Sequence, residues 1–392
     1  MLIQEKLRQA VGILNELSID CWLTFVRESG ISGEPTMPFL LSSDVTWHSA
    51  FIVTRCGRIC AIVGELDRKA VEDLGVYQEV IGYVEAINPP LVRLLEEIAP
   101  KQIAINYSKS SEICDGLTHG MYLTLLDILK PIQYDRRLIS SEPVISRLRA
   151  RKTETELERV QAAIRQTQEI FDLAAGFIHP GLTEKEIARF MLDEVKRRGL
   201  ETAWDRAHCP AVFTGPDTAG AHYRPTGRAV EPGHVLNMDF GIKVEDYCSD
   251  LQRTFYILEP GQDQAPEEVK KGFRTIRSAI EKSRRKLAPG VQGREVDAVA
   301  RREVVSAGYE EFPHGLGHQV GRFAHDGTAL LGPPWEKYAG KTFEPVERGM
   351  VFTLEPRLTV PGRGVVTIEE MVVVTENGAE YLSEPQQELI LI

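Results

Sequence analysis

The chain has 392 residues, of which 43% are hydrophobic and 26% are charged, and its formal net charge is -11 at pH 7. This length exceeds the size at which one hydrophobic core usually stops growing, so we expect two domains. The composition excludes disordered and collagen-like chains. The negative charge argues against a nucleic-acid or anionic-membrane partner, because a phosphate surface would be repelled.

The N-terminal stretch carries charges at helical spacing instead of the uninterrupted apolar core of a signal peptide. No later run approaches the length of a bilayer span. Six cysteines are scattered without the spacing of a disulfide framework or a zinc ribbon, which is typical of a reducing compartment. We therefore predict a cytoplasmic protein that is not attached to a membrane.

Helix and strand patterns alternate through the first third of the chain. They predict helices and strands in the order helix 3–17, strand 20–25, paired strands 50–54 and 58–63, helix 87–98, strand 102–106 and helix 116–129. Such alternation indicates an α/β domain over residues 1–137. The next stretch is rich in charged and turn-forming residues, so we predict a linker over 138–152 and a second domain over 153–392.

A long amphipathic helix is predicted to begin at residue 153 and to end at the breaker sequence His179-Pro180-Gly181. Either Thr153 or Thr155 is suited to cap its N-terminus. The expected apolar face contains Leu157, Val160, Ile164, Ile170 and Leu173.

The C-terminal part contains an internal repeat. Residues 178–201 align without gaps on residues 287–310 and share Pro, Gly, Glu and Val positions. In each copy a helix ends, a Pro-Gly turn follows, and a second amphipathic helix begins. We therefore expect two equivalent halves.

Each copy of the repeat is followed by two carboxylates on predicted strands. Segment 231–242 resembles segment 347–358, and a turn follows each of them, at 243–246 and at 361–364. The two acids of each half can therefore face each other across a hairpin. In chain order the four acids are Asp239, Asp250, Glu355 and Glu369.

Carboxylates flanked by apolar strand residues are costly to bury without partners, and four of them together would repel strongly. Two divalent cations would offset both effects, lower the pKa of a water molecule and polarise a carbonyl or phosphoryl oxygen. Oxygen ligands with one imidazole suit Mn²⁺, with Co²⁺, Zn²⁺ and Fe²⁺ as alternatives, better than a structural thiolate zinc site. The alternative is that the four acids are only solvent-exposed residues at strand ends beside turns. Their repeat-related positions and the nearby histidine cluster would then be accidental.

The histidine cluster lies in the glycine-rich segment HGLGHQVGRFAH, whose glycines would let the backbone approach a site closely. One of His314, His318 and His325 could bind a metal, and the others could donate hydrogen bonds to a developing oxyanion. His222, read alone, suits a loop. The remaining histidines are expected to be structural or exposed, namely His48, His119, His179, His208 and His234.

The motifs MDFG, YCSDLQRTF, HGLGHQVGRFAH, TLEP and TIEEM occur in the order found in metallopeptidase family M24. The chain resembles this family over about residues 150–392. Its N-terminal half is similar to the creatinase-like domain of the aminopeptidase P, prolidase and creatinase branch. The resemblance implies an α/β creatinase-like domain followed by an α+β pita-bread catalytic domain with an internal pseudo-two-fold repeat.

The resemblance also implies roles for the site residues. Glu355 would move the proton during hydrolysis, while His222 and His325 would contact the substrate and the transition state. His314 matches a further substrate-side histidine of the aminopeptidase P type. Implied partners are a small peptide with proline after the scissile bond and a second copy of the chain in a homodimer. The implied metal ligands are Asp239, Asp250, His318, Glu355 and Glu369.

Three positions depart from the family pattern. Arg357 and Thr359 stand where EPG is usually followed by Tyr, and Thr367 stands in place of the Arg of the R-I-E motif. We predict an Xaa-Pro dipeptidase, with an Xaa-Pro aminopeptidase as the alternative. Two other hypotheses, cleavage of a non-peptide C–N bond and a non-catalytic binding protein, conflict with the complete ligand set.

Overall fold

A computed structural model describes residues 2–216 and 223–392. The chain divides into two compact units, Met1–Arg149 and Ala150–Ile392. The first unit therefore extends beyond the predicted boundary at residue 137. Most of the predicted linker is regular structure, because Leu138–Ser140 form strand β6 beside β5 (Ile103–Ile105) and Glu142–Ala150 form helix α6.

The first unit is built on a mixed sheet with strand order β4-β3-β2-β1-β5-β6. The outer strand β4 spans Glu79–Tyr83, and the other strands are β1 (Cys21–Val26), β2 (Ser49–Thr54) and β3 (Ile59–Gly64). The predicted pairing of 50–54 with 58–63 is confirmed by the antiparallel β2–β3 ladder.

Helices cover both faces of this sheet, so its central strands are buried throughout. On one face lie α1 (Leu2–Leu17), α3 (Glu65–Asp73) and α6, and on the other lie α4 (Asn88–Ile98) and α5 (His119–Leu129). A short helix, α2, spans Ser29–Ser32. The predicted α/β class is confirmed, although the sequence reading missed α3 and β4.

The second unit contains two helix pairs that follow the repeat. The first pair is α7 (Glu154–Phe177) and α8 (Glu184–Arg197), and the second is α9 (Glu267–Lys286) and α10 (Gly293–Ser306). Capping boxes begin α7, α8 and α10, and Thr153 with Glu156 forms that of α7. Thr153, and not Thr155, is therefore the cap. Leu173 is 42% exposed, because the buried face of α7 passes through Ile170, Phe171 and Ala174 instead.

The strands of the second unit repeat in the same way. β9 (Val235–Phe240) pairs with β12 (Leu251–Tyr256), and β15 (Val351–Leu354) pairs with β18 (Glu370–Thr375), both antiparallel. A small hairpin lies between the members of each pair. These hairpins are β10 (Ile242–Val244) with β11 (Tyr247–Cys248), and β16 (Arg357–Val360) with β17 (Gly364–Thr367).

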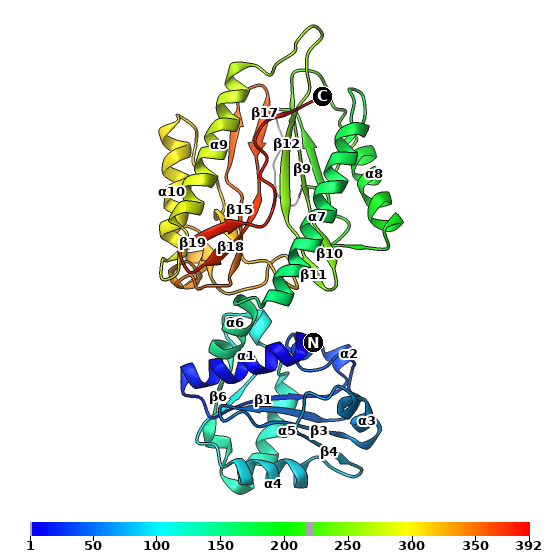
Figure 1. Cartoon of the computed structure of the whole chain (residues 1–392), viewed down its shortest axis with the longest axis vertical. Coiled ribbons are helices and arrows are strands. Elements are labelled where there is room, and N and C mark those ends of the chain that lie inside the picture. Colours follow the sequence, from blue (N-terminus) through cyan, green and yellow to red (C-terminus); the bar gives the residue numbers. More distant parts are fainter. Residues whose placement is uncertain (1, 217–222) are drawn as a thin grey trace. The chain divides into compact units, whose positions relative to one another are not determined.

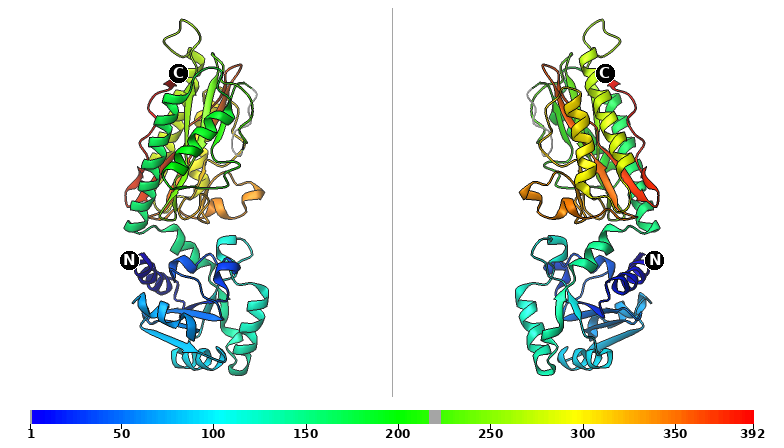
Figure 2. Two further views of the ribbon diagram at one scale, coloured as in Figure 1. Left: turned by 90° about the vertical axis from the view of Figure 1, so that its right-hand side faces the viewer. Right: turned by 90° about the vertical axis from the view of Figure 1, so that its left-hand side faces the viewer.

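The helix pairs flank these strands from opposite sides (Figure 1). The left view of Figure 2 has α7 and α8 toward the reader, and the right view has α9 and α10. Shorter strands complete the unit, namely β7 (Glu201–Thr202), β8 (Ala211–Thr214), β13 (Gly317–His318), β14 (Leu330–Leu331), β19 (Gly378–Tyr381) and β20 (Ile390–Leu391). This is the predicted pita-bread arrangement. Within the described residues, no helix is both long and apolar enough to cross a bilayer.

Candidate metal centre

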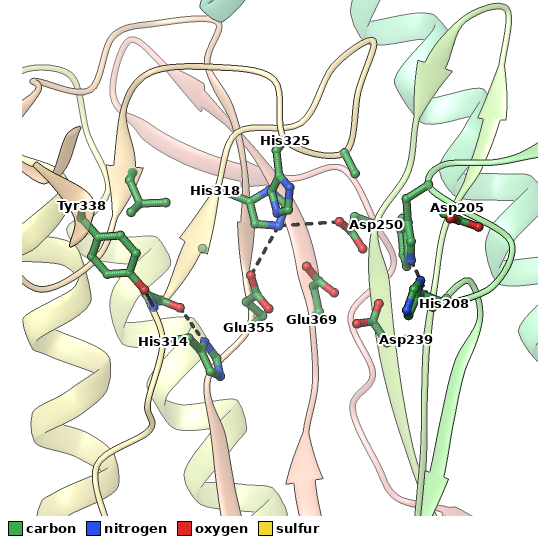
Figure 3. A pocket seen from close by; sticks show the side chains of 15 residues that line it. Asp205, His208, Asp239, Asp250, His314, His318, His325, Tyr338, Glu355 and Glu369 are labelled. Carbon is green, nitrogen blue, oxygen red and sulfur yellow. Dashed lines mark hydrogen bonds and ion pairs between the residues drawn. The ribbon is translucent and has the colours of Figure 1, made fainter. Parts of the chain in front are cut away.

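A cavity of about 590 Å³ lies in the second unit, where the two repeated halves meet. Its walls contain the four predicted carboxylates and three of the predicted histidines, and both halves contribute to it (Figure 3). His222 lies outside the described residues. The lining residues that bear on its chemistry are Trp204, Asp205, His208, Asp239, Asp250, His314, His318, His325, Tyr338, Glu355 and Glu369.

The four carboxylates occupy the ends of the paired strands. Asp239 is the fifth residue of β9, and Asp250 immediately precedes β12. In the second half, Glu355 immediately follows β15 and Glu369 immediately precedes β18. The small hairpin of each half separates its two acids in the chain and lets them return to the same cavity.

His318 reaches the carboxylates from β13. Its Nε2 lies 3.6 Å from Asp250 Oδ2 and 3.5 Å from Glu355 Oε1. A Cβ at the preceding Gly317 would collide with the carbonyl oxygen of Thr353, so this glycine permits a close approach of β13 to β15. The Thr353 hydroxyl accepts from the His318 backbone N–H at 3.1 Å and lies 3.4 Å from Glu355 Oε1.

Burial raises the pKa of all four carboxylates, and repulsion from neighbouring carboxylates adds to the effect at Asp250, Glu355 and Glu369. Burial raises the pKa of Asp239 to about 7. Burial also raises the pKa of Asp250 well above its ordinary value, with further contributions from Asp239 and Glu355. The pKa values of Glu355 and Glu369 are raised for the same reasons, burial first and neighbouring carboxylates second.

The same residues fit a pair of divalent cations. Asp239 Oδ1 and Glu369 Oε2 are buried and have no hydrogen-bond partner among the described residues. Ligand atoms of Asp250, His318 and Glu369 lie within 4.8 Å of one another. Buried anionic oxygens without partners are strongly unfavourable, and hard divalent cations prefer such oxygens. The donor set therefore matches the predicted cation pair in charge and in ligand type.

The other two histidines of the glycine-rich segment also line the cavity. The rings of His325 and His318 meet edge to face, with centroids 4.2 Å apart. His314 Nδ1 lies 2.8 Å from the Gly315 carbonyl oxygen. The pKa of His314 is lowered to about 4, chiefly by burial and also by the nearby charges of Arg357, Arg301 and Lys337, so its imidazole is neutral near pH 7.

His208, which was predicted to be structural or exposed, is half-buried and lines the cavity. Arg224 Nε donates to His208 Nε2 at 2.9 Å, and the Trp204 indole N–H donates to the His208 carbonyl at 3.1 Å. In Figure 3 the carboxylates lie between His314 and Tyr338 on one side and Asp205 and His208 on the other. The additional residues Asp205, His208 and Tyr338 lie outside the repeat and outside the histidine cluster, so no sequence pattern marked them as site residues.

Comparisons with known proteins agree with this architecture. A sequence model of metallopeptidase family M24 matches residues 158–376. An uncharacterized peptidase of Staphylococcus saprophyticus is 30% identical over 316 residues, which cover 78% of this chain and 79% of that protein. An uncharacterized peptidase of Bacillus subtilis is 25% identical and covers 71% of this chain and 73% of its own length.

Solved structures share the fold over nearly the whole chain. An Xaa-Pro dipeptidase from Bacillus anthracis has a TM-score of 0.75 at 22% identity and covers 100% of both chains. An X-Pro aminopeptidase from Thermotoga maritima has a TM-score of 0.74 at 24% identity and covers 96% of this chain and 99% of its own. At these identities the likeness establishes the two-domain pita-bread architecture.

Proposed function

Because this chain belongs to metallopeptidase family M24, we propose that it is a metal-dependent hydrolase that cleaves the peptide bond preceding proline, as an Xaa-Pro dipeptidase. One observation carries the proposal. Three buried carboxylates, the mostly buried Glu355 and one imidazole, from both halves of the repeat, converge in a single cavity large enough for a short peptide. The proposed metal ligands are Asp239, Asp250, His318, Glu355 and Glu369.

We propose Mn²⁺ as the native metal, because carboxylate oxygens with one imidazole suit a hard to borderline cation. When bound, a pair of divalent ions supplies Lewis-acid polarisation and a water of lowered pKa. The cytoplasmic location and the homodimer remain predictions.

The cavity offers groups for the proton transfers of peptide hydrolysis. The carboxylate of Glu355 would accept a proton from the attacking water and deliver it to the leaving nitrogen. His325, beside His318, would donate a hydrogen bond to the oxyanion as the carbonyl carbon becomes tetrahedral. His222 is proposed for the same task, and neutral His314 for contact with the substrate.

The charges at the two ends of the cavity favour a dipeptide. Near His314 lie the cationic groups of Arg357 and Lys337, which would attract a C-terminal carboxylate. At the other end Asp205 would attract the α-ammonium group. A dipeptide carries its α-ammonium group and its carboxylate a short distance apart, so it fits this arrangement of charges in the cavity. Extension past proline would move the carboxylate away from Arg357.

The competing specificity is that of an Xaa-Pro aminopeptidase, and the X-Pro aminopeptidase from Thermotoga maritima shares this fold. Assays with Mn²⁺ on an Xaa-Pro dipeptide and on the corresponding Xaa-Pro-Yaa tripeptide separate the two. We expect the dipeptide to be cleaved with the higher kcat/KM. Cleavage of the tripeptide alone would establish the aminopeptidase, and failure to cleave either peptide would refute both.

A further inference from the structure

Gln252 lies beside three of the four carboxylates, and in the motif YCSDLQRTF that contains it the sequence marked only Asp250 as a site residue. It is the second residue of β12, it lies directly opposite Asp239 of β9, and it is only 5% exposed. Its backbone also forms an isolated antiparallel bridge with Glu369, with N–H to carbonyl distances of 3.4 and 3.3 Å. One residue therefore connects the strands of both repeated halves.

The side-chain amide of Gln252 contacts a third carboxylate. Its Nε2 donates to Glu355 Oε2 at 3.4 Å, while its Oε1 accepts from the Thr367 hydroxyl at 2.9 Å. An ionised carboxylate only accepts hydrogen bonds, so the N–H end of the amide faces Glu355 and the oxygen end faces the Thr367 hydroxyl, which also lies 3.2 Å from the Pro356 carbonyl oxygen. The opposite oxygen of Glu355, Oε1, faces His318 and Thr353. The carboxylate of Glu355 is thus held from two sides.

We propose that Gln252, oriented by Thr367, is a positioning residue that holds the Glu355 carboxylate in the direction required for metal binding and proton transfer. A neutral amide suits this position, because it donates a hydrogen bond without adding charge to the cluster. An arginine or lysine would instead neutralise carboxylate charge that the cations need. The inference rests on the proposed metal site but not on the identity of the peptide substrate.

The chain offers volume-matched variants to test this. Gln252→Met removes both ends of the amide and retains a side chain of similar length. Thr367→Val removes the orienting hydroxyl and preserves the β-branched shape. Gln386→Met is the matched control, since Gln386 is also buried but its amide binds the backbone of Thr254 and Glu388.

Mn²⁺ binding to the full-length protein, measured by titration calorimetry, is the primary readout. Loss of a residue that orients a metal ligand typically costs roughly 10- to 100-fold in affinity or activity, which is the loss expected for Gln252→Met. Thr367→Val should weaken binding less. The double variant should bind no more weakly than Gln252→Met alone, because Thr367 acts through Gln252. Gln386→Met should lower the melting temperature and leave Mn²⁺ affinity unchanged.

Kinetics at saturating Mn²⁺ give the second readout. With an Xaa-Pro dipeptide we expect Gln252→Met to lower kcat and to leave KM unchanged, since Gln252 touches Glu355 and does not line the cavity. Wild-type Mn²⁺ affinity in folded Gln252→Met, or an equal loss in Gln386→Met, would overturn the positioning role. If wild type cleaves no Xaa-Pro peptide while the affinity differences hold, the positioning role stands and the proposed substrate class is wrong.

Discussion

Arg357 and Thr367 are direct partners across the β16–β17 hairpin. Both are positions at which the chain departs from the motif pattern of its family. Leu358 and Val360 of the same strand pack into the hydrophobic core, so Arg357 lies on the opposite face of the hairpin. Thr367 contacts Gln252, while the charge of Arg357 acts on His314. Arg357 of β16 is therefore the cation beside His314 that we propose for binding the substrate carboxylate.

Substitution of Arg357 tests the proposed recognition of the substrate carboxylate. Arg357→Met should raise KM for an Xaa-Pro dipeptide by roughly tenfold or more, because an ionic hydrogen bond of about 1.5–3 kcal/mol is lost. The dipeptide amide, which has no terminal carboxylate, should be unaffected by the substitution. Steady-state kinetics on both substrates measure this. Arg348→Met is the control, since Arg348 is 71% exposed. Equal losses on both substrates would refute carboxylate recognition.

Glu355→Gln should lower kcat by roughly 10²- to 10⁴-fold, because the amide cannot transfer a proton. The same substitution should raise the melting temperature of the metal-free protein, since it removes one of four mutually repelling carboxylates. Peptidase assays and thermal unfolding after chelation give the two values. Glu344→Gln, at an exposed position, is expected to change neither. Retention of full activity by Glu355→Gln would contradict the assigned role.

The stability of the metal-free protein should depend on pH in a defined direction. The four carboxyl groups have raised pKa values when folded, so the folded state binds more protons than the unfolded chain. Stability should therefore increase on acidification and fall as pH rises through about 7, where Asp239 loses its proton. Thermal unfolding across this pH range measures the trend, and Asp239→Asn should flatten it. A rise in metal-free stability with pH would contradict the burial of charged carboxylates.

Metal binding should release protons for the same reason. Cations bind the ionised carboxylates, and the folded metal-free site holds protons that must leave. Calorimetric titration of Mn²⁺ near pH 7 in two buffers of different ionisation enthalpy should therefore give different apparent heats. Identical heats would show that the carboxylates are already ionised.

The N-cap of α7 allows a separate test of the fold. Thr153→Ala should reduce the free energy of unfolding by about 1 kcal/mol, because it removes one half of the capping box with Glu156. Thr155→Ala, two residues away, should have a smaller effect, because Thr155 does not cap the helix. Chemical denaturation compares the two variants. A larger loss in Thr155→Ala would reverse the assignment of the cap.

Periodicity and repetition explain how much of the fold was predictable. The duplicated helix pairs and carboxylate pairs repeat the same pattern of apolar residues and turns. The elements predicted in one copy therefore supported those predicted in the other. Elements without a strong apolar face were missed. Helix α3 buries only Val71 and strand β4 is half-buried along its length, so neither has the pattern of a core element. Strand β6 was missed because its three residues are too few to show a periodic pattern.

The site was predictable where residues share a local pattern. His314, His318 and His325 lie within one short segment, and the four acids lie at repeat-related positions. His208 is brought to the cavity by a loop before β8, and a single histidine in a loop has no spacing to interpret. Gln252 was missed because its role depends on strand register and on the amide's two ends, which become visible only when Glu355 and Thr367 are placed beside it.

The bridge between Gln252 and Glu369 has a consequence for the assembly of the protein in the cell. Each duplicated half holds only two of the four acids, and the halves join where that bridge forms. A chain whose second half is still being synthesised, or has been lost to proteolysis, would lack a complete cation site. Since a bound ligand stabilises only the state that binds it, the proposed cations would stabilise a chain that contains both halves and would not stabilise either half alone.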